Sequence, residues 1–236
     1  MEIVEIIQDS LVYPSRNLMT LVIYMVLSIV MCVILLTTVV GTVASGTQNI
    51  GVSIAILSVG MVLTMLIWFL IQGYSLDIIK ISIERGDYHP KLDFMRQIIH
   101  GLKALIVDVI YLIIPIIISL ILFMFLSQWL AILVSFVLLV VFGLAGTMGL
   151  CRLAKTDDMM YALNVQEAIE DIISIGLFKV LVLIIVLFAI SFIVGTILIL
   201  INGAVGTTVG GVISGIVSVY LLFFQQRAYG LLYSDI

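Results

Sequence analysis

The sequence predicts an all-α, polytopic membrane protein with six transmembrane helices, and three observations support that prediction. Hydrophobic residues make up 64% of the chain and charged residues only 10%, whereas soluble domains contain about 45–50% apolar and about 25% charged residues. The mean hydropathy is +1.38, and a soluble domain of this length could not bury so much apolar surface. Six apolar runs each supply the ~20 helical residues that cross a bilayer core. Soluble enzymes, disordered chains and nucleic-acid-binding proteins are thereby excluded.

The six runs form a single membrane domain over residues 1–236. Each run is apolar on every face, unlike the one-sided helices at the surface of soluble proteins. A transmembrane β-barrel is disfavoured because the chain lacks strand-length segments that alternate between apolar and polar side chains. The predicted spans are residues 17–40, 51–71, 102–126, 128–150, 176–201 and 204–224.

The connections between the spans alternate in length and charge. Residues 41–50, 127–128 and 202–203 form short uncharged connections, whereas 72–101 and 151–175 are longer and polar. All 10 Lys and Arg residues fall on the side of the longer connections, and the positive-inside rule makes that side cytoplasmic. We therefore expect a multi-pass protein of the cell membrane with both termini in the cytoplasm.

An amphipathic stretch precedes each pair of spans. In residues 2–13, 91–100 and 164–173, apolar side chains recur at the spacings of about 3, 4 and 7 that mark one face of a helix. Because such helices can lie in the membrane interface, we expect three cytoplasmic interfacial helices, each followed by two spans in a possible threefold repeat. The alternative is a crude period that any six-span protein with alternating loops would show. The three units would be residues 1–85, 86–160 and 161–236.

One part of the chain carries a family resemblance. Residues 86–94 (GDYHPKLDF) and 100–105 (HGLKAL) lead into a span that contains Tyr111 and Pro115. This pattern resembles an uncharacterised, mostly archaeal integral membrane family catalogued as domain of unknown function 4013, although Phe94 stands where the family has a tryptophan nearby. The resemblance implies the six-span fold over nearly the whole chain. The family has no established activity, so the resemblance contributes no catalytic residues.

Asp108 is the one ionisable residue that we expect inside a span. A carboxylate at membrane depth costs roughly 2.5–3.5 kcal/mol at the bilayer centre and marks a functional site by default. Asp108 is therefore a candidate for proton or cation coupling, with Tyr111 and Pro115 beside it. The structural alternative places Asp108 near the interface, where Lys103 or the Tyr111 hydroxyl satisfies it. Pro115 should kink its span and free the Tyr111 carbonyl, either to line a pathway or to fit its neighbours.

Glycines in the later spans are candidate positions for close helix packing. Small residues spaced about three or four positions apart let two helices approach each other closely in a membrane. We expect these contacts within the chain more than between copies of it. The alternative for residues 202–215 is a glycine-broken re-entrant segment that lines a pore. The packing candidates are Gly143, Gly146, Gly149, Gly206, Gly210, Gly211 and Gly215.

The two histidines of the chain suggest a weak candidate for metal or proton binding. His89 and His100, together with Asp87 and Asp93, could form a metal-binding or pH-sensing cluster. Their spacing matches no specific zinc pattern, so a solvated cytoplasmic loop is the simpler interpretation. The sequence therefore predicts no metal site.

Other chemistry is equally weakly indicated. Asp157 and Asp158 are an adjacent acidic pair of the kind that can hold Mg²⁺ in lipid-phosphate enzymes, but such sites usually use more carboxylates at wider spacing. Cys32 and Cys151 belong to different apolar runs, and we interpret them as buried small side chains without a disulfide. We expect no catalytic residues and no cofactor, and we do not expect an enzyme.

Two functions fit these features. The first is a structural or accessory role, in which cytoplasmic amphipathic helices organise membrane lipids or dock a protein partner, because the opposite face carries no formal charge. The second is a small transporter or exporter component for an apolar or amphipathic solute, suggested by Asp108, Pro115 and the glycine-rich spans. A water-accessible cavity that reaches Asp108 from the cytoplasm would favour transport, and a packed apolar centre would favour the structural role.

Overall fold

A computed structural model describes residues 1–16, 18–46 and 49–236 of the chain. The described residues form helices joined by short connections, and no strand occurs among them. The predicted all-α fold is therefore confirmed. The helices are α1 (Ile3–Arg16), α2 (Leu18–Gly46), α3 (Ile50–Ile83), α4 (Phe94–Phe125), α5 (Gln128–Thr156), α6 (Met159–Ala162), α7 (Val165–Ile175), α8 (Leu177–Val205) and α9 (Thr207–Tyr233).

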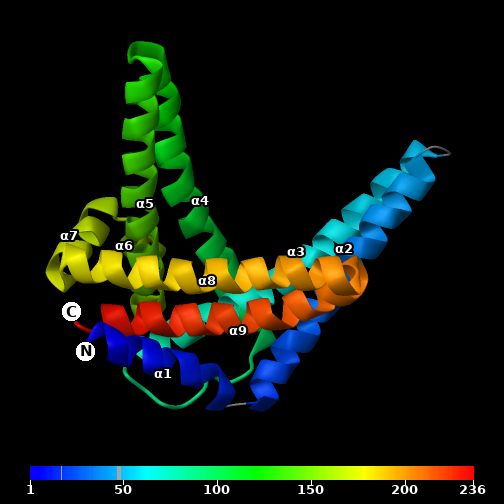
Figure 1. The fold of residues 1–236 in the computed structure, drawn as a ribbon, viewed down its shortest axis with the longest axis horizontal. Helices are drawn as coiled ribbons and strands as arrows, with labels where there is room; N and C mark the ends of the chain where they lie inside the picture. The colour runs from blue at the N-terminus through cyan, green and yellow to red at the C-terminus, as the bar shows by residue number, and fades with distance from the viewer. Residues whose placement is uncertain (17, 47–48) are drawn as a thin grey trace.

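Six helices are long and apolar enough to cross a membrane: α2, α3, α4, α5, α8 and α9. They pair into three hairpins, α2–α3, α4–α5 and α8–α9 (Figure 1). The prediction of a multi-pass membrane protein with six transmembrane helices is thus confirmed. The connections at the far ends of the hairpins are short, as the uncharged connections of the sequence suggested.

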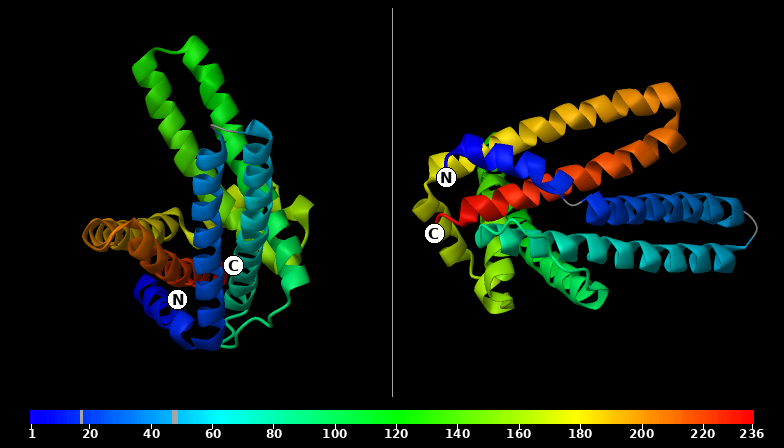
Figure 2. Two further views of the ribbon diagram at one scale, coloured as in Figure 1. Left: turned by 90° about the vertical axis from the view of Figure 1, so that its right-hand side faces the viewer. Right: turned by 90° about the horizontal axis from the view of Figure 1, so that it is seen from below.

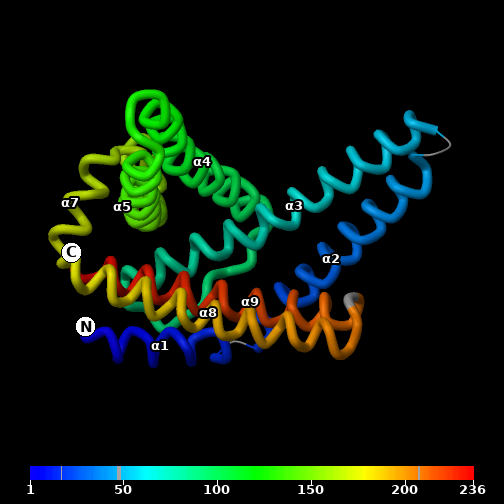
Figure 3. The backbone as a smooth tube through the Cα atoms, turned by 45° about the horizontal axis from the view of Figure 1, so that its top comes forward, coloured from blue at the N-terminus to red at the C-terminus, as the bar shows by residue number. Residues whose placement is uncertain are grey.

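The three hairpins do not pack into one bundle. They meet at one end of the molecule, here called the base, and their opposite ends, here called the tips, point in three different directions (Figures 1 and 2). Helix α3 passes through the middle of the base, where it packs against α2, α4, α5 and α9. The tube view shows both chain termini, α1 and α7 gathered at the base (Figure 3). The base comprises residues 1–16, 71–104, 144–183 and 219–236.

Several helices extend beyond the predicted spans. Helix α3 continues to Ile83 instead of ending at position 71, and α5 and α9 continue to Thr156 and Tyr233. These extensions are polar in sequence but buried in the base, so packing keeps them helical where hydropathy alone ends a span. Helix α2 likewise runs to Gly46 through part of the expected loop at 41–50. Asn17, the expected start of the first span, lies outside the described residues.

The three expected interfacial helices differ in outcome. Helices α1 and α7 are separate helices that cover the first and third amphipathic stretches. The second stretch, 91–100, forms no separate helix, because α4 begins at Phe94 and runs without interruption to Phe125. No proline or positive-φ residue interrupts the chain between Phe94 and the span, whereas Gly176 adopts φ +102° and separates α7 from α8. The prediction of three separate interfacial helices is therefore wrong for the second unit.

Buried side chains are concentrated in the base. The larger cluster joins α1, α3, α4, α5, α7, α8 and α9 around residues such as Met148 and Phe224, and a smaller one stacks Tyr24, Tyr74 and Phe223. In the most apolar stretch of each long helix, only 6% to 28% of the residues are buried within the protein. The arms of the hairpins therefore present apolar side chains outward, which suits contact with lipid and not with water.

Helices α3 and α4 cross with their backbones in close contact. A Cβ atom added to Gly73 of α3 would lie under 3.0 Å from the Gln97 carbonyl oxygen, and one added to Gly101 of α4 would meet the Phe69 carbonyl oxygen as closely. Real Cβ atoms do not come this near to a backbone atom, so the crossing requires glycine on both helices. This pair fixes how the first hairpin meets the second.

Candidate functional site

Three charged side chains are almost fully buried where α3, α5 and α9 enter the base. Asp77, Arg152 and Arg227 lie at equal intervals along the chain. All three are among the buried polar residues of the described chain. Burial of an unpaired charge is prohibitive, so each must have partners. In each case the partners come from the amphipathic segment that opens another hairpin unit.

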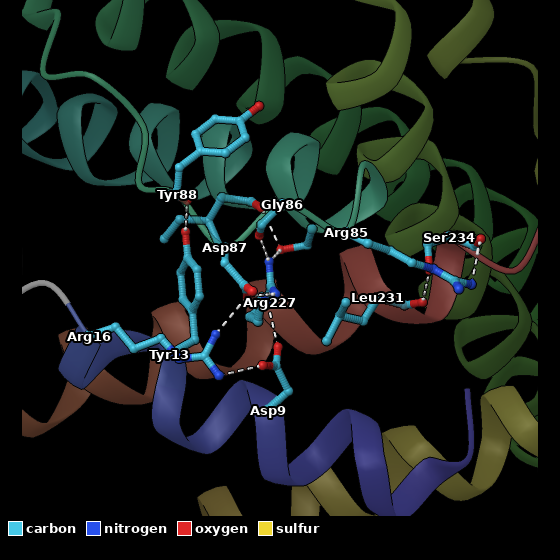
Figure 4. A network of polar contacts seen from close by, with 12 residues as sticks. Asp9, Tyr13, Arg16, Arg85, Gly86, Asp87, Tyr88, Arg227, Leu231 and Ser234 are labelled. Carbon is cyan, nitrogen blue, oxygen red and sulfur yellow. Dashed lines mark hydrogen bonds and ion pairs between the residues drawn. The ribbon is translucent and has the colours of Figure 1, made fainter.

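Arg227 of α9 holds α1 against the rest of the base (Figure 4). Its Nε atom donates to Asp9 at 2.8 Å, and its Nη1 atom donates to the Gly86 carbonyl oxygen at 2.7 Å. The guanidinium also lies 4.6 Å from the centre of the Tyr13 ring. Burial raises the pKa of the Tyr13 phenol to about 12, against the opposing effect of Arg227, so the ring stays neutral and presents its electron-rich face to the cation.

Arg152 of α5 holds α7 in the same manner. Its Nη1 atom donates to Asp171 at 2.8 Å, and its Nη2 atom forms an ion pair with Glu167. Its Nε atom donates to the Tyr161 carbonyl oxygen at 3.0 Å while the guanidinium covers the Tyr161 ring at 3.6 Å. Tyr233 donates to Asp171 at 3.1 Å. The amphipathic pattern of α7 is thus explained by its ion pairs with Arg152 as well as by contact with a membrane surface.

At Asp77 of α3 the sign of the charge is reversed. The carboxylate accepts from Arg96 Nη2 at 2.8 Å, and its other oxygen lies 3.1 Å from His100 Nδ1. Both partners belong to the first turns of α4, which is the second amphipathic stretch. Arg96 follows Asp77 by 19 positions, and Asp171 follows Arg152 by the same 19 positions. The three junctions therefore close a ring: α3 with α4, α5 with α7, and α9 with α1.

A surface carboxylate ties the end of the chain into this ring. Asp235 forms ion pairs with Lys179 of α8 and, at 2.9 Å, with Arg85, which follows α3 in the chain. Burial alone would raise the pKa of Asp235, but the hydrogen bond from Lys179 and the charges around it hold the pKa below its usual range. The carboxylate is therefore charged at neutral pH and links three segments of the base.

The predicted intramembrane residues converge on a different part of the molecule. Asp108, Tyr111 and Pro115 of α4 line one groove together with Gly143 and Gly146 of α5. This α4–α5 groove holds about 310 Å³, which is within the usual size of ligand sites. Helix α4 continues unbroken through Pro115, which is buried. Two sets of residues that the sequence indicated as separate candidates, one on each span, thus line the same groove.

The two side chains expected to satisfy Asp108 are engaged elsewhere. Lys103 Nζ forms an ion pair with Asp157 at 2.7 Å, and the Tyr111 hydroxyl donates to the Ala162 carbonyl oxygen at 3.0 Å. Neither side chain therefore satisfies Asp108, because residues five positions apart lie on different faces of a helix and Tyr111 points into the base. Asp108 forms no hydrogen bond or ion pair with any other residue that the structure describes.

The predicted packing glycines fall into two groups. An added Cβ atom would lie 3.0 Å or less from a neighbour at Gly149, Gly210 and Gly215, and 3.3 Å from Tyr111 at Gly146. Gly206 is instead the turn between α8 and α9, with φ +85°, a conformation that glycine adopts freely. This turn lies beyond the expected position 202–203. A Cβ atom added to Gly143, Gly206 or Gly211 would meet no atom within 4 Å, so these three glycines make no close contact within the described part of the chain.

The structure separates the two histidines. The His89 ring lies 4.8 Å from the Tyr13 ring, and burial lowers the pKa of His89 together with the nearby Arg16 and Arg227 charges. His100 pairs with Asp77 instead. Within the described ranges, no group of three potential ligands could hold a metal ion. Both cysteines are free thiols.

The two adjacent aspartates have separate local roles. Asp157 ends α5 with φ 58° and binds Lys103, and Asp158 caps α6 by accepting from the Met160 N–H at 2.8 Å. Burial raises the pKa of Asp157, but Lys103 and His100 outweigh it and the pKa is lowered. The pair is thus used in capping and in an ion pair.

A groove between α2, α8 and α9, which the sequence did not indicate, contains several hydroxyl and amide side chains. It holds about 430 Å³ and is lined by Ser28, Asn202 and Ser214 among others. The Ser28 hydroxyl donates to the Gly215 carbonyl oxygen at 3.1 Å, and Asn202 donates to Ser214 at 3.3 Å. Single hydroxyl groups in apolar runs are common, so only the contact between hairpins identifies these residues as neighbours.

Comparison with known proteins gives a family and no function. No curated protein and no solved structure matches the chain. Residues 56–203, which are more than half of the chain and run from within α3 to within α8, match the model of a family described as Protein of unknown function (DUF4013). The chain therefore belongs to this family, as the residues around positions 86–115 suggested.

Proposed function

We propose that the protein is a structural, lipid-organising membrane protein whose base lies at the cytoplasmic face and docks a protein partner there. The observation that supports this most is the divergence of the three hairpins from a base held by buried ion pairs. Every Lys and Arg belongs to the base or borders it, which supports a cytoplasmic base and cytoplasmic termini. The uncharged tips offer nothing that would hold a charged solute or a soluble protein.

The arms of the hairpins support the lipid-organising part of the proposal. Helices α2 and α3 contain 29 and 34 residues, which correspond to about 44 and 51 Å of helix, whereas the hydrocarbon core is about 30 Å thick. Longer helices fit by tilting or by extending past the core. Three hairpins that diverge from a shared base both tilt and extend past the core, and lipid chains fill the space between their arms.

The surface of the base supports partner docking. A cavity of about 420 Å³ opens between α3 and the segment that leads into α4, lined by Lys80, Glu84, Tyr88 and Lys91 among others. Its charged and aromatic groups suit a polar peptide segment of a partner protein. None of its lining residues also lines the α4–α5 groove.

The three junctions also support the repeat organisation. We propose units 1–85, 86–160 and 161–236, each an amphipathic segment followed by a hairpin. Equal intervals between Asp77, Arg152 and Arg227, and their pairing with the next amphipathic segment in cyclic order, support this division. In the first unit the acidic residue, Asp77, belongs to the hairpin and the basic residue, Arg96, belongs to the next amphipathic segment. The two charges have exchanged places but still form an ion pair, as expected if the units diverged from one repeated sequence.

Boundary lipid tests the proposed function. The purified protein in phosphatidylcholine vesicles that contain a spin-labelled phosphatidylcholine should restrict the motion of more lipids per protein than a compact six-helix membrane protein does, because three separate hairpins expose more perimeter. The fraction of restricted label in the electron paramagnetic resonance spectrum measures this. A count no higher than that of the compact protein, or movement of solute across the vesicles by the protein alone, would contradict the proposal.

A transporter or exporter component for an amphipathic solute is the second candidate. The unpaired Asp108 in a groove of ligand size favours it. The pockets of the base, which include Asp77 and Arg96, share no lining residue with that groove. The structural role therefore has the stronger support.

A further inference from the structure

The α4–α5 groove places one charge at the end of an apolar trench. Asp108 and Thr147 lie at its end nearest the base, and Pro115 and Leu139 lie nearer the tip. The seven positions from Asp108 to Pro115 correspond to about 10 Å of helix. At Gly143 an added Cβ atom would meet nothing within 4 Å, so the wall of the trench is open there. The trench is long enough for the first part of an alkyl chain, and a longer chain would continue past Pro115 toward the tip.

The polar groups that line this groove can accept hydrogen bonds but have few protons to offer. The Thr147 hydroxyl donates to the Leu144 carbonyl oxygen at 2.7 Å, and the Tyr111 hydroxyl donates to Ala162. Pro115 has no N–H, which leaves the Tyr111 carbonyl oxygen without its helical donor. The carboxylate of Asp108 accepts from no described residue. A ligand that fits must therefore bring the donors and a positive charge.

We propose that the α4–α5 groove binds a cationic amphiphile: a protonated amine that carries a single alkyl chain. The ammonium group donates to the Asp108 carboxylate, and the chain lies along Leu112, Pro115 and Leu139. Charge complementarity selects the cation, since a carboxylate at membrane depth is costly unless it is paired or protonated. The apolar walls select an alkyl chain over a hydrated metal ion. This inference does not depend on the structural role proposed above.

Dodecylamine is the probe. Native mass spectrometry of the full chain released from nonionic detergent micelles should show one bound dodecylamine, and titration gives its dissociation constant. Asp108→Asn keeps the shape and removes the charge, and we expect it to weaken binding about tenfold or more, as for a lost hydrogen bond to a charged group. Gly143→Leu should weaken binding comparably by filling the trench, without touching the carboxylate.

Three controls make the result decisive. Asp158→Asn removes the same charge from the base and keeps a capping side chain, so its affinity should match that of the wild type. Dodecanol and dodecanoate carry the same chain without the positive charge and should not compete. Dodecylamine binding that is absent, unchanged in Asp108→Asn and Gly143→Leu, or displaced equally by dodecanoate would overturn the proposal. The boundary-lipid count should stay the same in both variants, which separates this test from that of the structural role.

Discussion

Replacing Arg227 by alanine is expected to lower the free energy of unfolding by about 3–5 kcal/mol, the usual cost of breaking a buried ion pair from one side. The Arg227 side chain is only 2% exposed. Its removal leaves Oδ2 of Asp9 and the Gly86 carbonyl oxygen without the donors that Arg227 supplies, and it leaves a cavity beneath the Tyr13 ring. Unfolding of the detergent-solubilised protein by sodium dodecyl sulfate, followed by circular dichroism, measures the change.

Arg16→Ala is the matched control. Arg16 forms ion pairs with Asp9 at 2.7 Å and with Asp87 at 2.8 Å, and Arg227 also lies 3.6 Å from Asp87, but the Arg16 side chain is 35% exposed. Exposed ion pairs contribute about 0–1 kcal/mol, so this variant should lose little stability. Equal losses in Arg16→Ala and Arg227→Ala would show that the buried ion pair does not hold α1 to the base.

Alanine at Gly73 or at Gly101 is expected to destabilise the protein by about 1–3 kcal/mol or more, the usual cost of overpacking. The added Cβ atom would collide with a carbonyl oxygen of the facing helix, Gln97 for the first variant and Phe69 for the second. Backbone atoms cannot rotate away as a side chain can, so α3 and α4 must separate. Thermal unfolding in detergent measures the loss.

Gly195→Ala is the control for this pair. Gly195 lies within α8, and an added Cβ atom there meets nothing within 4 Å. Alanine in an open helical position stabilises by roughly 0.5–1 kcal/mol relative to glycine. The sign of the effect should therefore differ between Gly195→Ala and the two variants at the crossing. A neutral or stabilising effect at Gly73 would show that the two helices do not approach as closely as described.

The spans were predictable because hydropathy is a local property. A run such as 102–126 exceeds the length that a bilayer core requires, whatever its neighbours are. The ends of the helices were not predictable in this way. The segment from Ile71 to Ile83 contains Asp77 and Lys80 and stays helical only because it is buried among other helices. Likewise, nothing in the local sequence shows that Gly73 and Gly101 face backbone atoms of the other helix.

The partners of the charged residues depend on contacts across the whole chain. Asp9 and Arg227 are 218 positions apart, and the amphipathic pattern of α1 says only that one face is polar. The same kind of pattern predicted three interfacial helices. No break separates the second amphipathic stretch from the span that follows it, so this stretch forms the start of α4 instead. For Asp108 the sequence identified the residue and its neighbours Tyr111 and Pro115. The sequence could not show that Asp108 has no partner among the described residues, because Lys103 pairs instead with Asp157, which is 54 positions away.

The central claim is that three hairpins diverge within the membrane from one shared base. Double electron–electron resonance tests it most directly, with pairs of spin labels on a chain whose Cys32 and Cys151 are replaced by alanine. Ile50, Ser127 and Gly203 lie at or near the three tips, and Lys80 and Lys155 are exposed at the base. We predict that all three tip-to-tip distances in lipid nanodiscs exceed the distance between the base labels. Tip distances no longer than the base distance, as in a bundle whose neighbouring axes lie about 8–10 Å apart, would contradict the claim.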